Sequence, residues 1–162
     1  MGFEADTEVS PLTAEQEAQL HRMAVERAPE ALAKLERSTT QVERFYALTD
    51  AAPAALYLRQ DEKAAELATE LIEVAPIFEG NWNYGNAIHA AHTVRGLLAL
   101  SQGDTGLAVK ELHRSGASPG SPQLASFGPT MQLAKALLRI GEFEAVLQYL
   151  QQCRAFWEMG EP

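Results

Sequence analysis

Apolar residues recur at three- and four-residue intervals along most of this chain, the spacing that places them on one face of a helix. Two capping boxes, Thr13 with Gln16 and Thr40 with Glu43, mark the starts of the first two helical regions. No segment alternates between apolar and polar residues with a period of two, and β-branched residues are few. The pattern therefore predicts an all-α fold.

Interruptions of this pattern divide it into about seven helices. Proline removes a backbone hydrogen bond, so we expect Pro29 to divide the first region near Ala28 and Pro53 to kink or break the second. Pro129 fits the first turn of a later helix. The expected segments include 41–58, 61–75, 83–103, 104–116 and 129–141, and a last helix with Phe143, Val146, Leu147, Leu150, Cys153 and Trp157 along one apolar stripe.

Two of the expected helical hairpins share one residue spacing. Gly96-x-x-Ala99-x-x-x-Gly103-x-x-x-x-Ala108-x-x-x-Leu112 matches Ala134-x-x-Leu137-x-x-x-Gly141-x-x-x-x-Val146-x-x-x-Leu150. Small residues stand where paired helices would cross closely. Glycine stands at each turn, where a residue with left-handed backbone geometry ends the first helix. The chain is thus expected to form stacked antiparallel hairpins.

This spacing resembles the tetratricopeptide repeat, in which a small residue, a larger one, a turn glycine, and then Ala and an aromatic residue or Leu recur at these offsets. A weaker third copy covers residues 40–76. The turn glycines Gly103 and Gly141 are 38 residues apart instead of about 34, and the extra residues fall within the loop at 116–128. The segment 79–157 also resembles small bacterial proteins of this kind, which supplies no function. The resemblance implies a curved stack with a concave groove.

The length of 162 residues and the 46% hydrophobic content suit one domain with a core, which we expect over residues 11–162, after a flexible tail at 1–10. No apolar run approaches the ~18 residues of a membrane-spanning helix. The first residues lack the basic and apolar stretches of a secretory signal, so a cytoplasmic location is expected. Cys153 is the only cysteine, which leaves no intrachain disulfide and no cysteine-based zinc site. We expect no cofactor.

The net charge of −9 is unevenly distributed: residues 1–79 hold 16 acidic and seven basic side chains, and residues 80–162 hold six of each. An acidic surface repels phosphate backbones and anionic lipids, so we expect neither nucleic acid nor a membrane as partner. The acidic residues either keep an Ala-rich helical surface soluble or steer a cationic partner. The balanced C-terminal half permits a homo-oligomer, which an exposed face with Phe156 and Trp157 would mark.

The segment 79–89 differs from the Ala/Leu/Glu-rich helices around it, because it is rich in Asn, Gly and aromatic residues. Asn86 is the strongest candidate for a functional contact, since Asn inside a helix competes for backbone groups; it would contact a ligand or the loop at 116–128. Asn83 either caps the helix or binds a peptide backbone. Trp82 and Tyr84 either form flat apolar walls of a site or pack in the core.

His89 and His92 follow on the same expected helix, in one row with Gly85 and Gly96. They could converge on a shared ligand, pack half-buried between helices, or act in acid/base chemistry. A metal would need a third ligand. None is nearby in the sequence, so we expect no metal site.

The loop from Ser118 to Pro129 is rich in proline and is therefore expected to be stiff. Rigid loops on helical scaffolds often carry function. Gln123, Ser126 and Phe127 are the candidates to point inward. The alternative is a structural spacer in which Leu124 and Phe127 plug the gap between hairpins.

Taken together, these features predict a binding module. Its groove, lined by the helix at 81–93 and the loop at 118–129, would hold a peptide, a protein segment or a small polar ligand. The alternative is a small enzyme with His89 or His92 as general acid or base and Asn86 orienting the substrate. Within the sequence we find no phosphate-binding glycine loop, dinucleotide fingerprint, nucleophile elbow or zinc-protease motif.

Overall fold

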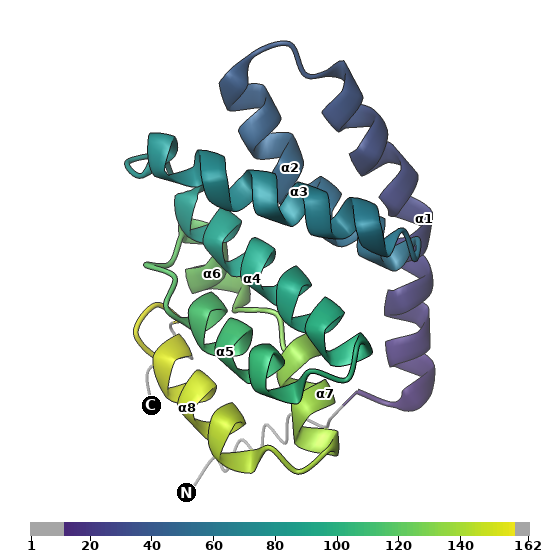
Figure 1. Ribbon diagram of the computed structural model, residues 1–162, viewed down its shortest axis with the longest axis vertical. Helices are drawn as coiled ribbons and strands as arrows, with labels where there is room; N and C mark the ends of the chain where they lie inside the picture. Colours follow the sequence, from purple (N-terminus) through teal and green to yellow (C-terminus); the bar gives the residue numbers. More distant parts are fainter. Residues whose placement is uncertain (1–11, 158–162) are drawn as a thin grey trace, which may run out of the picture.

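The computed structural model describes residues 12–157, and every regular element among them is helical (Figure 1), which confirms the all-α fold. The expected tail at 1–10 lies outside the described residues. Among the helices at 12–157, none is both long and apolar enough to cross a membrane. The elements are α1 (Ala14–Arg37), α2 (Gln41–Tyr57), α3 (Asp61–Val74), the 3-10 helix η1 (Ala75–Phe78), α4 (Tyr84–Ser101), α5 (Thr105–Gly116), α6 (Pro122–Phe127), α7 (Gln132–Arg139) and α8 (Phe143–Cys153).

Side-chain caps start four of the described helices, and in α6 the cap is the Ser121 hydroxyl, which accepts from the Leu124 N–H. Both capping boxes are present: Thr13 with Gln16 begins α1, and Thr40 with Glu43 begins α2. The Asp104 carboxylate accepts a backbone N–H in the first turn of α5. Each cap satisfies a donor that the first turn of a helix leaves without a partner, which is why the starts of α1, α2 and α5 could be predicted.

The prolines affect the helices less than the sequence suggested. α1 continues through Pro29 and α2 through Pro53, so the expected division at Pro29 is wrong and Pro53 does not break its helix. A proline inside a helix removes one hydrogen bond, and the remaining bonds and the packing of these long helices outweigh that loss. Pro129 does not start a helix, because α7 begins at Gln132. The short α6 forms within the expected loop, with Pro122 in its first turn.

The three hairpin turns share one backbone geometry. The turn glycines Gly103 and Gly141 have φ angles of 81° and 92°, so the expected left-handed conformation is confirmed. The α2–α3 turn has Arg59 at this place, with φ of 59°, the only positive φ of a non-glycine residue among residues 12–157. In each turn, the N–H of the residue after the one with positive φ donates to the carbonyl five residues before it. These bonds join Gln60 to Ala55, Asp104 to Ala99 and Glu142 to Leu137.

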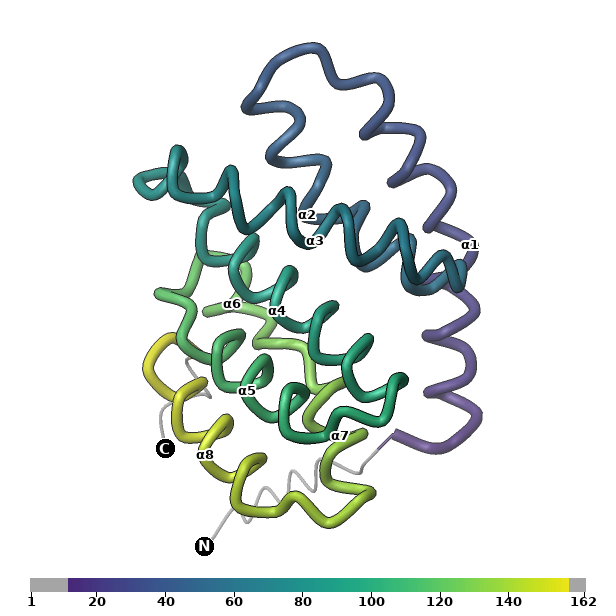
Figure 2. The backbone as a smooth tube through the Cα atoms, in the orientation of Figure 1, coloured from purple at the N-terminus to yellow at the C-terminus, as the bar shows by residue number. Residues whose placement is uncertain are grey.

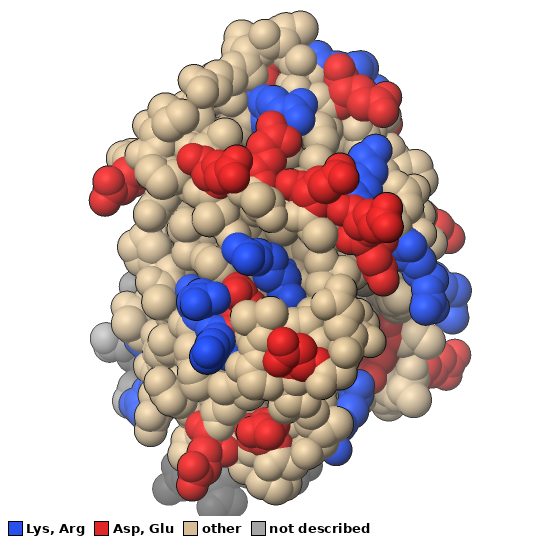
Figure 3. Space-filling model, viewed as in Figure 1, with Lys and Arg blue, Asp and Glu red and all other residues tan. Residues whose placement is uncertain are grey.

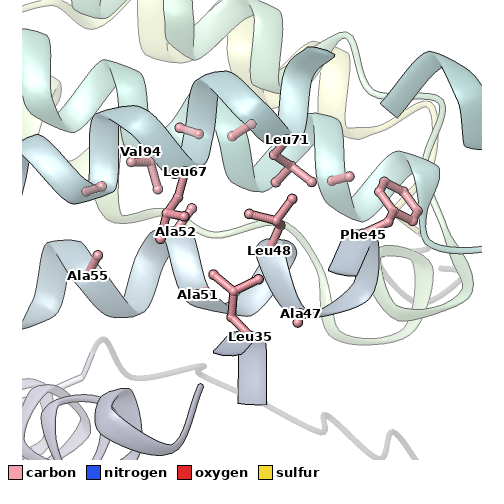
Figure 4. Packing of buried hydrophobic residues seen from close by; sticks show 14 of the residues in the cluster. Leu35, Phe45, Ala47, Leu48, Ala51, Ala52, Ala55, Leu67, Leu71 and Val94 are labelled. Atoms are coloured by element: carbon pink, nitrogen blue, oxygen red, sulfur yellow. The ribbon is translucent and has the colours of Figure 1, made fainter. Parts of the chain in front are cut away.

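Helix α4 is the central element of the stack. It packs between α3 and α5, and α8 packs on α5 from the other side (Figure 2). Buried residues of α4 contribute both to a core shared with α1–α3, where Phe45, Leu48 and Leu71 lie (Figure 4), and to a second core shared with α5, α7 and α8. A Cβ on Gly96 would collide with the Leu133 side chain, so this small residue permits the close approach that the repeat spacing predicts.

The last helix buries a different face from the expected stripe. Tyr149 is completely buried, and its hydroxyl donates to the Thr130 carbonyl at 2.7 Å. Among the residues of the expected stripe, Val146 and Cys153 are buried, whereas Phe143, Leu147 and Leu150 are exposed.

Phe156 and Trp157 are half-buried, so they do not form the exposed face considered above. Phe156 packs over Gly120 and Trp157 over Gly128, where an added Cβ would lie 2.5 Å from the Phe156 Cβ and 2.6 Å from the indole. Both glycines also have positive φ angles. The two aromatic side chains therefore hold the loop between α5 and α7 in place.

Candidate functional site

A cavity of about 520 Å³ opens between α1, α2, α4 and the segment that leads into α7. We call it the groove. Ala90 and Leu97, on one row of α4, belong to its floor, Leu56 and Tyr57 of α2 form one wall, and Gln132 lies on the opposite wall. Its volume is within the range of about 300–1,000 Å³ in which proteins hold small ligands or short peptide segments.

Polar groups surround this apolar floor. The Tyr57 hydroxyl donates to the Gln132 side-chain oxygen at 3.4 Å, a long bond that links the two walls. Burial raises the pKa of Tyr57, so its hydroxyl remains a donor near neutral pH. Arg59, Asp61 and Ser101 line the groove beyond the end of α2.

Arg59 combines two unusual properties. Its positive φ costs an L-residue energy that glycine avoids at the equivalent turns. Among residues 12–157, no carboxylate lies within 4.0 Å of its guanidinium. Backbone strain tends to persist at functional sites, and this strained residue lines the groove with its charge free.

His89 lines the groove, and both of its ring nitrogens are hydrogen-bonded. The Thr130 N–H donates to Nε2 at 3.0 Å, so Nε2 carries no proton, and Nδ1 therefore donates to the Ser115 carbonyl at 3.2 Å. Burial lowers the pKa of His89, and the bond to Ser115 offsets only part of this effect. His89 is thus a neutral side chain that connects α4 to the end of α5 and the approach to α7.

Amide hydrogen bonds join the start of α4 to α2. The Asn81 amide donates to the Tyr46 hydroxyl at 2.8 Å, and the Asn83 amide donates to the Thr49 hydroxyl at 2.9 Å. Asn83 is buried and occupies the N-cap position of α4, but its side chain makes no cap bond. Buried polar groups need such partners, so these bonds fix the position of α2 against α4.

Asn86 uses both of its amide protons within the protein. The Nδ2 group donates to the side-chain oxygens of Asn83 and Gln123, each at 3.2 Å, and Oδ1 accepts from the Ser121 hydroxyl. The expected contact between Asn86 and the loop is therefore confirmed. Asn86 lies one turn before Ala90 on the same row of α4, so this cluster stands beyond the groove at its Asn-rich end.

His92 does not converge with His89. Its Nδ1 donates to one carboxylate oxygen of Glu111 at 2.6 Å, and Arg114 donates to the other at 2.5 Å. Glu111 is completely buried, and these two donors compensate for its loss of water. Within residues 12–157 no three His, Cys, Asp or Glu side chains lie together as a metal site requires.

The remaining candidates lie outside the groove. Trp82 is 52% exposed and stacks on Tyr46, with ring centroids 5.3 Å apart. Tyr84 packs against the first core. Ser126 is exposed and Phe127 is 86% exposed, so the expectation that they point inward is wrong.

Sequence reasoning missed Tyr57, Arg59 and Gln132, together with the contribution of α1 through His21. One signal was present, because Arg59 stands at the turn of the weaker repeat copy, where the other copies have glycine. The remaining residues look like ordinary helix positions, and only the packing of distant helices brings them together.

Charge is divided on one outer face of the molecule (Figure 3). Acidic side chains follow α3, whereas Lys and Arg gather over α4 and α5. Part of the excess of acidic side chains in residues 1–79 thus lies on the exposed side of α3, opposite the buried Leu67 and Leu71.

No protein-family model, curated protein or solved structure matches this chain. The function proposed below therefore rests on the geometry of the groove.

Proposed function

We propose that this protein is a binding module of the tetratricopeptide-like type, and that the groove holds a short peptide segment of a partner protein. The observation that carries this proposal is a concave site of about 520 Å³ with an apolar floor and polar groups around it. Stacks of helical hairpins commonly bind partners on such a concave surface.

The lining suggests what the segment must contain. An apolar side chain of the partner would rest on Ala90, Val94 and Leu97, where it would be removed from water. A carboxylate would reach Arg59, whose guanidinium has no ionic partner among residues 12–157 and can hold an acid with two hydrogen bonds. The favoured segment therefore joins an acidic residue to an apolar one.

The geometry supports binding better than catalysis. A general base needs a free lone pair, and the Nε2 lone pair of His89 already accepts from Thr130. His92 has a carboxylate partner in Glu111, as many catalytic histidines do, but it does not line the groove. For catalysis, His89 would have to break its hydrogen bonds, or His92 would have to act on a substrate bound outside the groove.

A peptide array followed by fluorescence polarisation of the strongest sequences tests the proposal. Arg59→Gly relieves the backbone strain and removes the charge, so we expect unchanged or higher stability with about 10-fold weaker binding. Arg154→Ala, an exposed arginine outside the groove, is the matched control and should bind as wild type. Equal affinities for all three proteins would exclude the groove as the binding site.

Self-association is a second candidate, favoured by the exposed Phe143, Leu147 and Leu150 on α8. In a stack of hairpins the next helix would cover this face, and a second copy of the chain can do the same. We expect sedimentation to show a dimer that Leu147→Glu dissociates. A concentration-independent monomer in the wild type would contradict this.

A further inference from the structure

The first half of α1 is attached to the protein by very few contacts. Among its 24 residues, only Ala28 and Leu35 are buried, and both lie in the second half of the helix. The segment Ala14–Arg27, which we call the arm, has no buried residue. It extends beyond α2 toward α7 (Figure 1). A helical segment that buries so little gains little stability from its position.

The arm contacts the groove through His21 and the neighbouring helix α7 through Glu17. The His21 ring lines the groove and meets the Tyr57 ring edge-on, with centroids 5.7 Å apart. One turn earlier, the Glu17 carboxylate lies 3.2 Å from the Lys135 ammonium and 3.7 Å from the Arg139 guanidinium. These pairs are partly exposed, so each contributes only modestly to holding the arm.

The arm joins the rest of α1 at a weak point. Pro29 has no N–H, so the carbonyl four residues earlier, that of Val25, has no helical partner. Bends in helices concentrate at such positions. A bend at Val25 would let the arm move while the buried Ala28 and Leu35 keep the second half of α1 on α2.

We propose that the arm is a built-in competitor for the side of the groove formed by α2 and α7, and that the partner places an acidic amphipathic helix there in place of the arm. This inference rests on the proposed function of the groove. Glu17, His21 and Ala24 form one row of the arm at helical spacing, and the buried Ala28 continues this row beyond the arm. A partner helix with an acid, a ring and a small residue in the same row would meet Lys135, Tyr57 and the α2 wall in the same way.

A helix suits this site better than an extended strand. The described residues 12–157 offer no sheet edge to which a strand could add. Lys135 and Arg139 pair with Glu17, and Tyr57 contacts His21, so the site receives an acid and a ring that lie one helical turn apart on the arm. An acidic helix is thus favoured although the whole chain is acidic.

The test uses the full-length protein and a fluorescent peptide with the sequence of residues 12–27. In the wild type the attached arm competes at high effective concentration and weakens peptide binding. Glu17→Lys replaces the attraction to Lys135 and Arg139 by repulsion, so we expect it to bind the peptide about 3- to 10-fold more tightly. Glu15→Lys is the matched control: it makes the same charge change on the opposite side of the arm and should bind as wild type.

Two further measurements separate the possible outcomes. Trypsin should cleave after Arg22 faster in Glu17→Lys than in Glu15→Lys, because the released arm is open to the protease. Adding Lys135→Glu to Glu17→Lys restores an opposite pair and should return the cleavage rate after Arg22 toward wild type.

Equal peptide affinity in all the variants would overturn the competitor role while leaving peptide binding by the groove intact. Failure of every variant to bind the peptide, together with Arg59-dependent binding of array peptides, would overturn the acidic helix as partner but not the proposed function. If neither the arm peptide nor any array peptide binds in an Arg59-dependent way, the groove is rejected as the binding site. Circular dichroism checks that each variant keeps its helices.

Discussion

Replacing Gly85 by alanine tests whether the loop between α5 and α7 is docked on the first turn of α4. A Cβ at this position would collide with the Gly120 carbonyl group, 2.6 Å from its carbon, and would lie 3.1 Å from the Ser118 hydroxyl oxygen. The obstacle is backbone, which cannot swing aside as a long side chain can. The Ser118 hydroxyl also donates to the Gly85 carbonyl at 2.7 Å, so a shift of the loop breaks this buried bond.

The cost follows from these contacts. Overpacking costs about 1–3 kcal/mol, and the lost hydrogen bond adds about 1 kcal/mol. The higher helix propensity of alanine compared with glycine offsets up to about 1 kcal/mol of this cost. We therefore expect Gly85→Ala to lower the free energy of unfolding by about 2 kcal/mol, equivalent to a fall in Tm of roughly 4–8 °C for a domain of this size.

Urea denaturation followed by far-ultraviolet circular dichroism measures this difference directly. Gly80→Ala is the matched control, because nothing lies within 4 Å of a Cβ at Gly80, and it should stay within about 0.5 kcal/mol of wild type. Similar stability of the two variants would refute the docked position of the loop.

Two other predictions concern the buried histidine and the buried acid. Because burial lowers the pKa of His89 below its ordinary 6.5, the unfolded chain binds the proton more readily. The stability from neutral His89 is full above about pH 6.5 and is lost as pH falls below it. Urea titrations between pH 5 and 8 should show this slope in wild type and not in His89→Gln; identical slopes would contradict it. Glu111→Ala should cost about 1–3 kcal/mol, because it leaves His92 without its buried acceptor, whereas the exposed Glu144→Ala should cost less than about 0.5 kcal/mol. Equal costs in thermal unfolding would show that Glu111 is not buried as described.

The helix starts and the repeat turns could be predicted because they depend on short-range chemistry. Thr13 and Thr40 cap their helices through residues three positions away. Gly103 and Gly141 adopt the left-handed conformation that the spacing indicated. The effect of proline was misjudged for the opposite reason, since α1 and α2 continue through it with the support of the surrounding packing.

The sequence leaves two contacts open for Asn86, a ligand or the loop at 116–128, and the structure has the contact with the loop. The sequence does not show whether the Asn86 amide is free to bind a ligand or is already hydrogen-bonded within the protein. In the folded protein both amide protons of Asn86 are donated, one to Asn83 and one to Gln123. Phe127 is exposed to water. The groove lies one turn further along α4, with walls from residues that carry no local signal.

By itself, the order of residues determined that this chain is helical, where most helices begin and end, and that two hairpins repeat. Those properties follow from hydrogen bonds and apolar spacing within a few positions along the chain. Only the tertiary structure decided that His21, Tyr57, His89 and Gln132 surround one groove and that His92 turns toward Glu111. The physical reason is that both outcomes depend on how distant helices share a buried surface, which no local pattern specifies.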